Sequence, residues 1–430
     1  MMGNHVSING KRTTDGFKNI TKGLGGTRDP QHATYYQRSY LHNERTASDF
    51  YTTDWLAGRV IDVPVDEATR EWREMLIEDE DKRKEWSKFE GKINLASNFA
   101  TAEKWARVYG GAVLLIVTDD DALEKPLDIN SITTESKLRL IPLDRYRIVA
   151  DVPIRDVLDE NYGLPKFYTV TESGVRVHHS RVIRFEGVKT TITEAQRNNY
   201  WGASYYERLF DPIKNSQTST QLISGMLYES NISTWKLKGL NELVGSKQDD
   251  LVIKRVKLAT EMKSTINGAA IDSEDDLVNI SKNFAGLAEI DDKAALKVAA
   301  AAGIPYTKLM GKSADGMNAT GEGDMKNYYD MVRSDIQEGK FRDRLEYVDT
   351  IIAKIIDIEQ PEFDFKPLYQ LSEKEQADVE NVRAQRDVAY FDRGIIGEED
   401  ILTDLAKNET YPTASKRLDE LKELDEEIEE

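Results

Sequence analysis

The spacing of apolar positions changes along the chain, and each change predicts a different element. Apolar residues recur at helical intervals through 49–109, and we expect Pro64 to interrupt the first helix. A second helix is expected to end at Gly110 and Gly111, and the apolar run AVLLIV at 112–117 then predicts a buried strand. Short alternating stretches predict further strands at 138–150, 166–170 and 175–185. The pattern is typical of a mixed α+β fold.

The second half of the chain is mainly helical. Residues 204–228 predict a long helix whose middle is rich in Ser, Thr, Gln and Asn, so it has no strong apolar face. A lone helix of this composition is only marginally stable in water, whereas packing against copies of itself would stabilise it. A smaller mixed unit is expected at 235–285, and further helices at 290–302, 325–357 and 372–430. Near the end, a narrow apolar stripe suits helix–helix contact and consists of Leu418, Leu421, Leu424 and Ile428.

The composition excludes several kinds of chemistry. The 430 residues include no cysteine, which removes disulfides, Cys-ligated zinc and thiol catalysis. The run at 112–117 is far shorter than a bilayer-spanning segment, and no apolar run precedes it at the N-terminus. We therefore expect a soluble intracellular protein with no membrane partner.

Charge is distributed unevenly along the chain. The net charge of −19 argues against a simple nucleic-acid-binding protein, because phosphate binding requires Lys and Arg. Residues 1–48 nevertheless have a net charge of +4 and residues 236–263 a net charge of +3, whereas the tail 416–430 has a net charge of −5. Two basic segments are thus available for partners, although solvated surface with local bias explains either segment alone.

The stretch GKSADGMNATGEGD at 311–324 contains four glycines and the tripeptide Gly-Lys-Ser. It does not fit a phosphate-binding P-loop, because the first glycine of that motif would fall at Tyr306. The dinucleotide frame also fails, because Lys326 stands where its third glycine is required. Glycines lower the cost of a changing backbone, so we expect this segment to change shape beside something large.

Candidate catalytic groups are sparse. His32-Ala33-Thr34 and His178-His179-Ser180 each match the H-x-[ST] motif, of which two-histidine phosphoesterases use a pair as acid and base. The motif is short and arises often by chance. The acidic stretches at 119–124 and 272–276 lack the glycine and terminal glutamate of a calcium loop, so we expect solvated turns and no metal site.

Five segments in a fixed order resemble portal proteins of tailed bacteriophages and prophages, in the branch first catalogued as a domain of unknown function. The resemblance extends over about 50–405. The segments are DWLAGRVIDVPVDEATREWREM, LIPLDRYRIV, VHHSRVIRFEG, WGASYYERLFDPI and GIPYTKLMGKSADGMNATGEGDMKNYYDMVRSDIQ. Some relatives of this branch are cut down or fused to a phosphodiesterase that degrades immune cyclic nucleotides of the host.

The resemblance implies a portal fold with a mixed α/β wing, a two-helix stem, a small α/β clip and a helical crown. Such chains assemble into a ring, usually of twelve subunits, at one capsid vertex. Carried over to this sequence, the parts are a basic arm at 1–48, a wing at 49–203, stem helices at 204–230 and 287–305, a clip at 231–286, a wing segment at 306–369 with a tunnel loop at 311–324, and a crown at 370–430.

The resemblance also implies where partners bind. Double-stranded DNA would pass non-specifically through the ring during packaging and ejection, touching Lys312, Asn318 and Thr320 of the tunnel loop. The basic clip would dock the terminase large subunit and later a head–tail adaptor. The clip residues expected to take part are Trp235, Lys254, Arg255 and Lys257. In an alternative, Thr320 or Asp324 caps a helix beginning near Met325.

The remaining expectations concern chemistry and location. We expect no enzyme activity, no catalytic residues, no cofactor and no metal, since the packaging motor is a separate terminase. The other partners would be the major capsid or scaffold protein and copies of the chain itself. The protein would reside at the portal vertex of the virion and in the host cytoplasm during assembly. The alternative function is a two-histidine phosphodiesterase acting on cyclic nucleotides.

Overall fold

The computed structural model describes residues 43–119, 122–159, 162–229, 233–236, 254, 257, 276–279, 284, 286–311, 322–369, 373–407, 413 and 417–418. The chain forms two compact units, residues 1–366 and 367–430. The division falls close to residue 370, where the resemblance places the start of the crown. The assignment of the individual parts stays a prediction.

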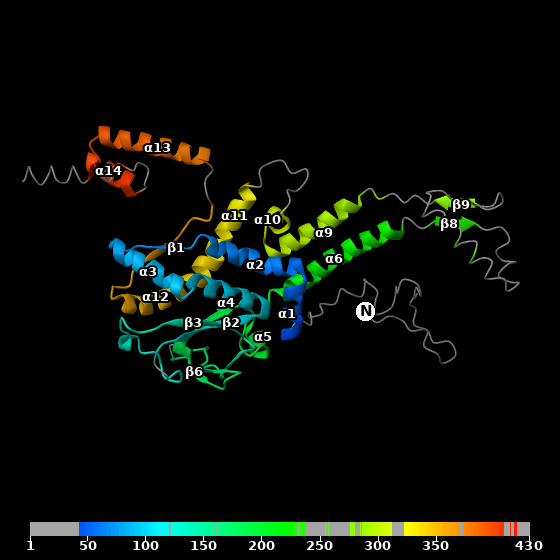
Figure 1. Cartoon of the computed structure of the whole chain (residues 1–430), viewed down its shortest axis with the longest axis horizontal. Helices are drawn as coiled ribbons and strands as arrows, with labels where there is room; N and C mark the ends of the chain where they lie inside the picture. Colours follow the sequence, from blue (N-terminus) through cyan, green and yellow to red (C-terminus); the bar gives the residue numbers. More distant parts are fainter. Residues whose placement is uncertain are drawn as a thin grey trace, which may run out of the picture. The chain divides into compact units, whose positions relative to one another are not determined.

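The first unit contains helices and short antiparallel sheets, which confirms the mixed α+β class (Figure 1). Its helices are α1 Glu44–Thr53, α2 Trp55–Arg70, α3 Glu80–Lys92, α4 Leu95–Tyr109, α5 Ile192–Arg197, α6 Tyr206–Glu229, α9 Leu287–Ala302, α10 Tyr306–Met310, α11 Glu322–Val332 and α12 Arg342–Ile356. A π-helical segment, Arg333–Phe341, joins α11 to α12, and two 3-10 turns lie at Ile129–Ser131 and His179–Arg181.

Within the described ranges, the strands pair in four small sheets. They are β1 Arg73–Met75, β2 Gly111–Val117, β3 Arg139–Asp144, β4 Ile148–Ala150, β5 Phe167–Val170, β6 Arg176–His178, β7 Val182–Glu186, β8 Ser233–Lys236, β9 Asp276–Asn279 and β10 Phe363–Phe365. The sheet orders are β3-β2-β7, β4-β5-β6, β1-β10 and β8-β9, and every pair is antiparallel. The strands predicted at 112–117, 138–150, 166–170 and 175–185 are confirmed.

The second unit has two described helices, α13 Glu373–Asp392 and α14 Glu398–Lys407. Both agree with the predicted helical character of the region from 372 onward. Of the apolar stripe at 418–428, Leu418 lies among the described residues and the other members lie outside them.

The expectation that Pro64 interrupts the first helix is wrong. Helix α2 continues through Pro64 to Arg70, and Pro64 itself is buried. A proline inside a helix loses one backbone hydrogen bond, but here one face of α2 is covered by tertiary packing. Val60, Ile61 and Val65 on that face are at most 2% exposed, and this burial holds the helix together across the proline.

Close backbone contacts at two glycines fix the position of the chain just before α6. Gly110 ends α4 with φ +88°, as expected for a helix that turns directly into a strand. A Cβ atom on Gly110 would lie 2.5 Å from the carbonyl oxygen of Gly202, and one on Gly187 would lie 2.4 Å from that of Ala203. Only glycine permits this approach, so the chain just before α6 is held tightly against the start of β2.

Aromatic side chains join the long helix to the rest of the core. The ring of Phe99 on α4 lies 5.5 Å from that of Phe185 on β7 and 5.6 Å from that of Phe341, the last residue of the π-helical segment. All three rings are fully buried and meet edge to face. The predicted helix at 325–357 is therefore confirmed as α11 and α12, although the π-helical turn between them was not predicted.

Candidate functional site

Most of the predicted contact residues lie outside the described part of the chain. This holds for Lys312, Asn318 and Thr320 of the expected tunnel loop and for Arg255 of the expected clip. Trp235 lies on β8 opposite Leu277 of β9. Lys254 and Lys257 are described without their sequence neighbours, and both are exposed. The roles assigned to these residues stay predictions, and the described residues that flank 311–324 become the site that the structure defines.

Helix α10, which leads into this segment, is fixed to α2 by an arginine. The Nε of Arg59 donates to the carbonyl oxygen of Leu309 at 2.7 Å, and its Nη2 donates to that of Lys308 at 2.9 Å. These carbonyls belong to the last turn of α10 and have no partner within the helix. Gly311 then ends α10 with φ +69°. The point at which the chain leaves α10 is thus set by a side chain of α2.

A buried carboxylate makes a second connection between the same helices. Glu67 of α2 is 4% exposed and lies 2.6 Å from Nζ of Lys308 and 2.6 Å from Nε of Arg70. Two cations compensate the charge of one carboxylate, which a largely buried glutamate requires. Neither Arg59 nor Glu67 was named from the sequence. The sequence pattern could have indicated that Glu67 is buried, because Glu67 stands seven residues after Val60 on the apolar face of α2.

Helix α11 begins at Glu322, so the last three residues of the segment are helical and Asp324 lies inside the helix instead of capping it as the alternative expected. The helix is also anchored in the core. Tyr328 is 3% exposed, and its hydroxyl has no hydrogen-bond partner among the described residues. Burial raises the pKa of this hydroxyl above its usual value, with the charge of Glu67 adding to the effect. Nζ of Lys308 lies 5.9 Å from the ring centroid of Tyr329. Both flanks of 311–324 therefore meet the same region of α2.

A cavity of about 600 Å³ lies beside these anchors. It is lined by the end of α9, the turn into α10, α11 and the π-helical segment, including Ala302, Pro305 and Met331. Arg107 and Lys340 also line it, and both pair with the fully buried Glu103, at 2.9 Å and 2.5 Å. The end of α11 nearest the segment thus borders open space with charged walls.

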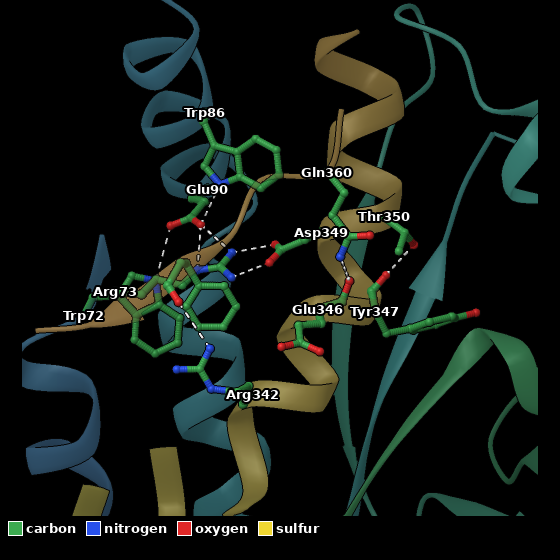
Figure 2. A network of polar contacts seen from close by, with 11 residues as sticks. Trp72, Arg73, Trp86, Glu90, Arg342, Glu346, Tyr347, Asp349, Thr350 and Gln360 are labelled. Carbon is green, nitrogen blue, oxygen red and sulfur yellow. Dashed lines mark hydrogen bonds and ion pairs between the residues drawn. The ribbon is translucent and has the colours of Figure 1, made fainter. Parts of the chain in front are cut away.

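The opposite end of the long helix is held by a buried polar network (Figure 2). Arg73 on β1 donates from Nη1 to Oδ2 of Asp349 at 2.5 Å and from Nη2 to Oδ1 at 2.6 Å. It also donates to Glu90 on α3, which accepts bonds from the indole nitrogens of Trp86 and Trp72 at 2.9 Å and 3.2 Å. One guanidinium therefore joins strand β1, helix α3 and helix α12.

The pair α6 and α9 forms a different kind of feature. The two helices lie side by side (Figure 1), and Oγ1 of Thr220 donates to Oδ1 of Asp291 at 2.7 Å. The start of α6 and the end of α9 are rooted in the core, as the burial of Leu209 and Val298 shows. The far halves expose large apolar side chains. These are Leu222, Met226, Leu227 and Ile290, with exposed fractions of 41 to 63%.

The described half of the two-histidine motif forms a turn. Nδ1 of His178 accepts from the backbone N–H of Ser180 at 3.3 Å, and Oγ of Ser180 accepts from the backbone N–H of Leu127 at 2.8 Å. Burial, with neighbouring positive charge, lowers the pKa of the His178 imidazole. His32, in the other motif, lies outside the described residues.

The described residues also bear on metal binding and on membrane insertion. No group of three or more acidic or histidine side chains is arranged to hold a metal ion within the described ranges. Among the helices described, none combines the length and the apolar character needed to cross a membrane.

Three relatives with known sequences match most of the chain. A protein of Haemophilus influenzae, described only as uncharacterized, is 27% identical and aligns over 95% of this chain and 93% of its own length. Two proteins named anti-CBASS protein Acb1 are also similar. That of Sphingomonas paeninsulae is 28% identical over 94% of this chain, and that of a Caulobacter species is 30% identical over 86%. The chain spans 67% and 62% of the length of these two relatives.

Two solved structures resemble the fold at lower similarity. A chain from the neck of a native GTA particle has a TM-score of 0.47 and 13% identity, and covers 83% of this chain and 91% of its own. A chain from the neck of an empty GTA particle has a TM-score of 0.48 and 14% identity, and covers 87% of this chain and 97% of its own. The sequence model of the phage portal protein family matches residues 45–389, which is most of the chain. The chain therefore belongs to the phage portal protein family.

Proposed function

We propose that the chain is one subunit of a closed ring, usually of twelve copies, at a capsid vertex through which double-stranded DNA is packaged and ejected. Membership of the portal family supports this proposal. The α6–α9 pair is the observation that supports ring assembly. Its outer halves expose Leu222, Met226 and Ile290. Copies of the pair set side by side in a ring would cover these side chains, and each buried leucine contributes about 1.5–3 kcal/mol.

In this proposal the segment 311–324 lies at the narrowest part of the tunnel. The described flanks support this role, because Arg59 and Glu67 hold α10 while Tyr328 holds α11. A contact segment needs fixed ends if it is to act at a defined position. Lys312 is the only cation of the segment, so its grip on phosphate would be weak and would allow the duplex to slide.

The remaining partners are assigned by charge and by position in the sequence. The basic segment within 231–286 would dock the terminase large subunit during packaging and a head–tail adaptor afterwards, since opposite charge speeds encounter. The wing or crown would contact the major capsid or scaffold protein. The protein would be assembled in the host cytoplasm and retained in the virion.

Ring assembly can be tested with a matched pair of substitutions. Leu222→Glu places a charge on the exposed part of α6, and Leu76→Glu places the same charge at a site of similar exposure outside the α6–α9 pair, 63% against 55%. Native mass spectrometry and negative-stain images should show closed rings for the wild type and Leu76→Glu, and mainly monomers for Leu222→Glu. Wild-type protein that forms only monomers and dimers at every concentration and salt would contradict the proposal.

The contact roles need separate tests. Replacing Lys312, Asn318 and Thr320 together with alanine should leave rings and melting temperature nearly unchanged while reducing packaged DNA. If Thr320 instead caps α11, the variant should lose about 1 kcal/mol of stability and package normally.

Reversing the charges of Lys254, Arg255 and Lys257 should preserve rings and abolish capture of the terminase in a pull-down assay. Unchanged capture would refute the docking role.

The phosphodiesterase alternative has one supporting observation, which is the similarity to two proteins named Acb1. Against it, His178 and Ser180 are engaged in a local turn. Incubating purified rings with cyclic oligonucleotides tests this alternative directly. Hydrolysis that is lost in His178→Ala would favour the enzyme over the structural conduit.

A further inference from the structure

Helix α13 exposes almost its whole surface. It extends over 20 residues, Glu373–Asp392, and every side chain from Ala377 to Phe391 is exposed except that of Asp387. A helix without packed side chains is only marginally stable in water, because most of the stability of a helix in a protein comes from the burial of an apolar face. Helix α13 therefore needs a contact that the described residues of its own unit, 367–430, do not supply.

The exposed apolar side chains of α13 form two stripes on opposite sides of the helix. Stripe 1 has the three- and four-residue spacing of one helix face and consists of Val379, Val382, Arg386 and Tyr390. Stripe 2 has the same spacing and consists of Ala377, Glu380, Ala384, Val388 and Phe391. Val379 and Val388 are nine residues apart, which is about two and a half helical turns, so they point in opposite directions. The large apolar side chains of the two stripes are 37 to 66% exposed.

Each stripe contains one charged residue, and the two charges have opposite signs. Arg386 belongs to stripe 1, where its Nη2 lies 2.7 Å from Oδ1 of the adjacent Asp387 and the guanidinium keeps further N–H donors. Glu380 belongs to stripe 2, is exposed, and has no cationic partner among the described residues. A contact between stripe 1 of one helix and stripe 2 of another therefore brings opposite charges together.

One displacement along the helix axis matches the two stripes in both charge and size. When a parallel copy of α13 is displaced by six residues, about 9 Å, Arg386 of one helix lies at the level of Glu380 of the other. The same displacement places Tyr390 opposite Ala384. A large side chain then meets a small one, which allows the two helices to pack closely. The two stripes are thus complementary to each other, whereas neither is complementary to itself.

We propose that α13 packs between two other copies of the chain, with its stripe 1 against stripe 2 of the next copy. This inference rests on the proposed ring, in which every subunit has a neighbour on either side. A contact between two different faces of the same chain closes into a ring when it is repeated around an axis. A helix with apolar side chains on two opposite sides suits this arrangement, because a single partner would leave one stripe exposed.

Engineered disulfides test this contact in the assembled full chain, which has no cysteine of its own. In the variant with Tyr390→Cys and Ala384→Cys, each stripe 1 cysteine should lie within about 7 Å of a stripe 2 cysteine of the next copy, a Cα separation that a disulfide can bridge. Oxidised rings should therefore give a ladder of linked chains on a non-reducing gel. The matched control combines Tyr390→Cys with Ala377→Cys, which lies on stripe 2 about 10 Å from that level and should give no ladder.

The other outcomes of the disulfide experiment overturn the proposal. Linked dimers from Tyr390→Cys alone would show that stripe 1 meets stripe 1 of a second copy. Equal ladders from the test and control pairs would show that the stripes have no fixed register. Rings without a ladder would contradict this inference alone, whereas wild-type protein that forms no ring in native mass spectrometry would contradict the proposed function as well.

Hydrogen exchange of the α13 amides gives an independent measurement on assembled rings. Arg386→Glu sets like charges opposite each other and should speed this exchange by about tenfold, because α13 loses the packing that stabilises it. Adding Glu380→Arg reverses both charges and should restore slow exchange. Gln385→Glu, the control, adds a negative charge at an exposed position between the stripes and should leave the exchange unchanged. Exchange that is unaffected by Arg386→Glu, or that Glu380→Arg does not restore, would overturn the proposal.

Discussion

The two ends of the long helix, residues 322–356, are built differently. At the α12 end, the buried pair of Arg73 and Asp349 ties the helix to β1 and α3, and eight residues of α12 are buried. At the α11 end, the helix borders the 600 Å³ cavity and buries Tyr328, whose hydroxyl has no partner among the described residues. The π-helical segment Arg333–Phe341 lies between these two ends.

The difference shows which part of the helix is fixed and which part has room to change. A close-packed region resists displacement, because each side chain would lose many contacts at once. A region beside a cavity and a π-helical turn can change its register at lower cost, and such turns are frequent at functional sites. The expected tunnel loop adjoins the second region, which is where a response to passing DNA would be needed.

The largest expected effect is at the close-packed end. Asp349→Ala leaves Arg73 buried, with Glu90 as its remaining acidic partner among the described residues, and breaking a buried ion pair costs about 3–5 kcal/mol. Asp343→Ala on the same helix is the control, since Asp343 is exposed, and its effect should stay within about 0.5 kcal/mol. Urea unfolding of both variants measures the difference. Similar losses for the two variants would show that the network does not hold α12.

The second prediction compares two substitutions that add the same side-chain volume, one beside each end of the long helix. Ala353→Leu on α12 inserts three carbon atoms at a site that is 4% exposed, and overpacking of this kind costs about 1–3 kcal/mol. Ala302→Leu adds the same atoms at the wall of the cavity and should change stability by less than about 0.5 kcal/mol. Thermal unfolding compares the two. A larger loss for Ala302→Leu would contradict the assignment of free space to the α11 end.

The third prediction concerns pH. Burial raises the pKa of Asp349 from 3.8 to about 6, partly opposed by the hydrogen bond and charge of Arg73. The folded state therefore holds this proton more tightly than the unfolded state, and lowering the pH through 6 stabilises the fold. Relative to Asp349→Asn, the wild type should gain about 1 kcal/mol in unfolding free energy between pH 7 and pH 5. A constant difference, or one of opposite sign, would show that Asp349 titrates outside this range.

The sequence predicted local elements better than long-range contacts. Alternation and apolar runs located β2 to β7, and the pattern of 204–228 predicted the helix α6. The α2 helix was misjudged at Pro64 because its burial is a tertiary property. The pairing of Arg73 with Asp349 joins residues 276 positions apart, and the sequence around one residue does not indicate that the other is its partner. The anchors Arg59 and Glu67 meet α10 across a similar separation.

The smallest expected effect compares two tyrosine hydroxyls, one at each end of the helix. Tyr347 of α12 donates to the carbonyl oxygen of Ser180 at 2.6 Å, so Tyr347→Phe removes a hydrogen bond and should cost about 1 kcal/mol. Tyr328 of α11 buries its hydroxyl without a partner among the described residues, so Tyr328→Phe removes a desolvated polar group. It should therefore leave stability unchanged or raise it by up to about 1 kcal/mol. The two variants delete the same atom, and their difference in unfolding free energy isolates the local environment. A destabilised Tyr328→Phe would mean that the hydroxyl has a partner in the assembled ring, and repeating the measurement on Leu222→Glu monomers would then abolish the loss.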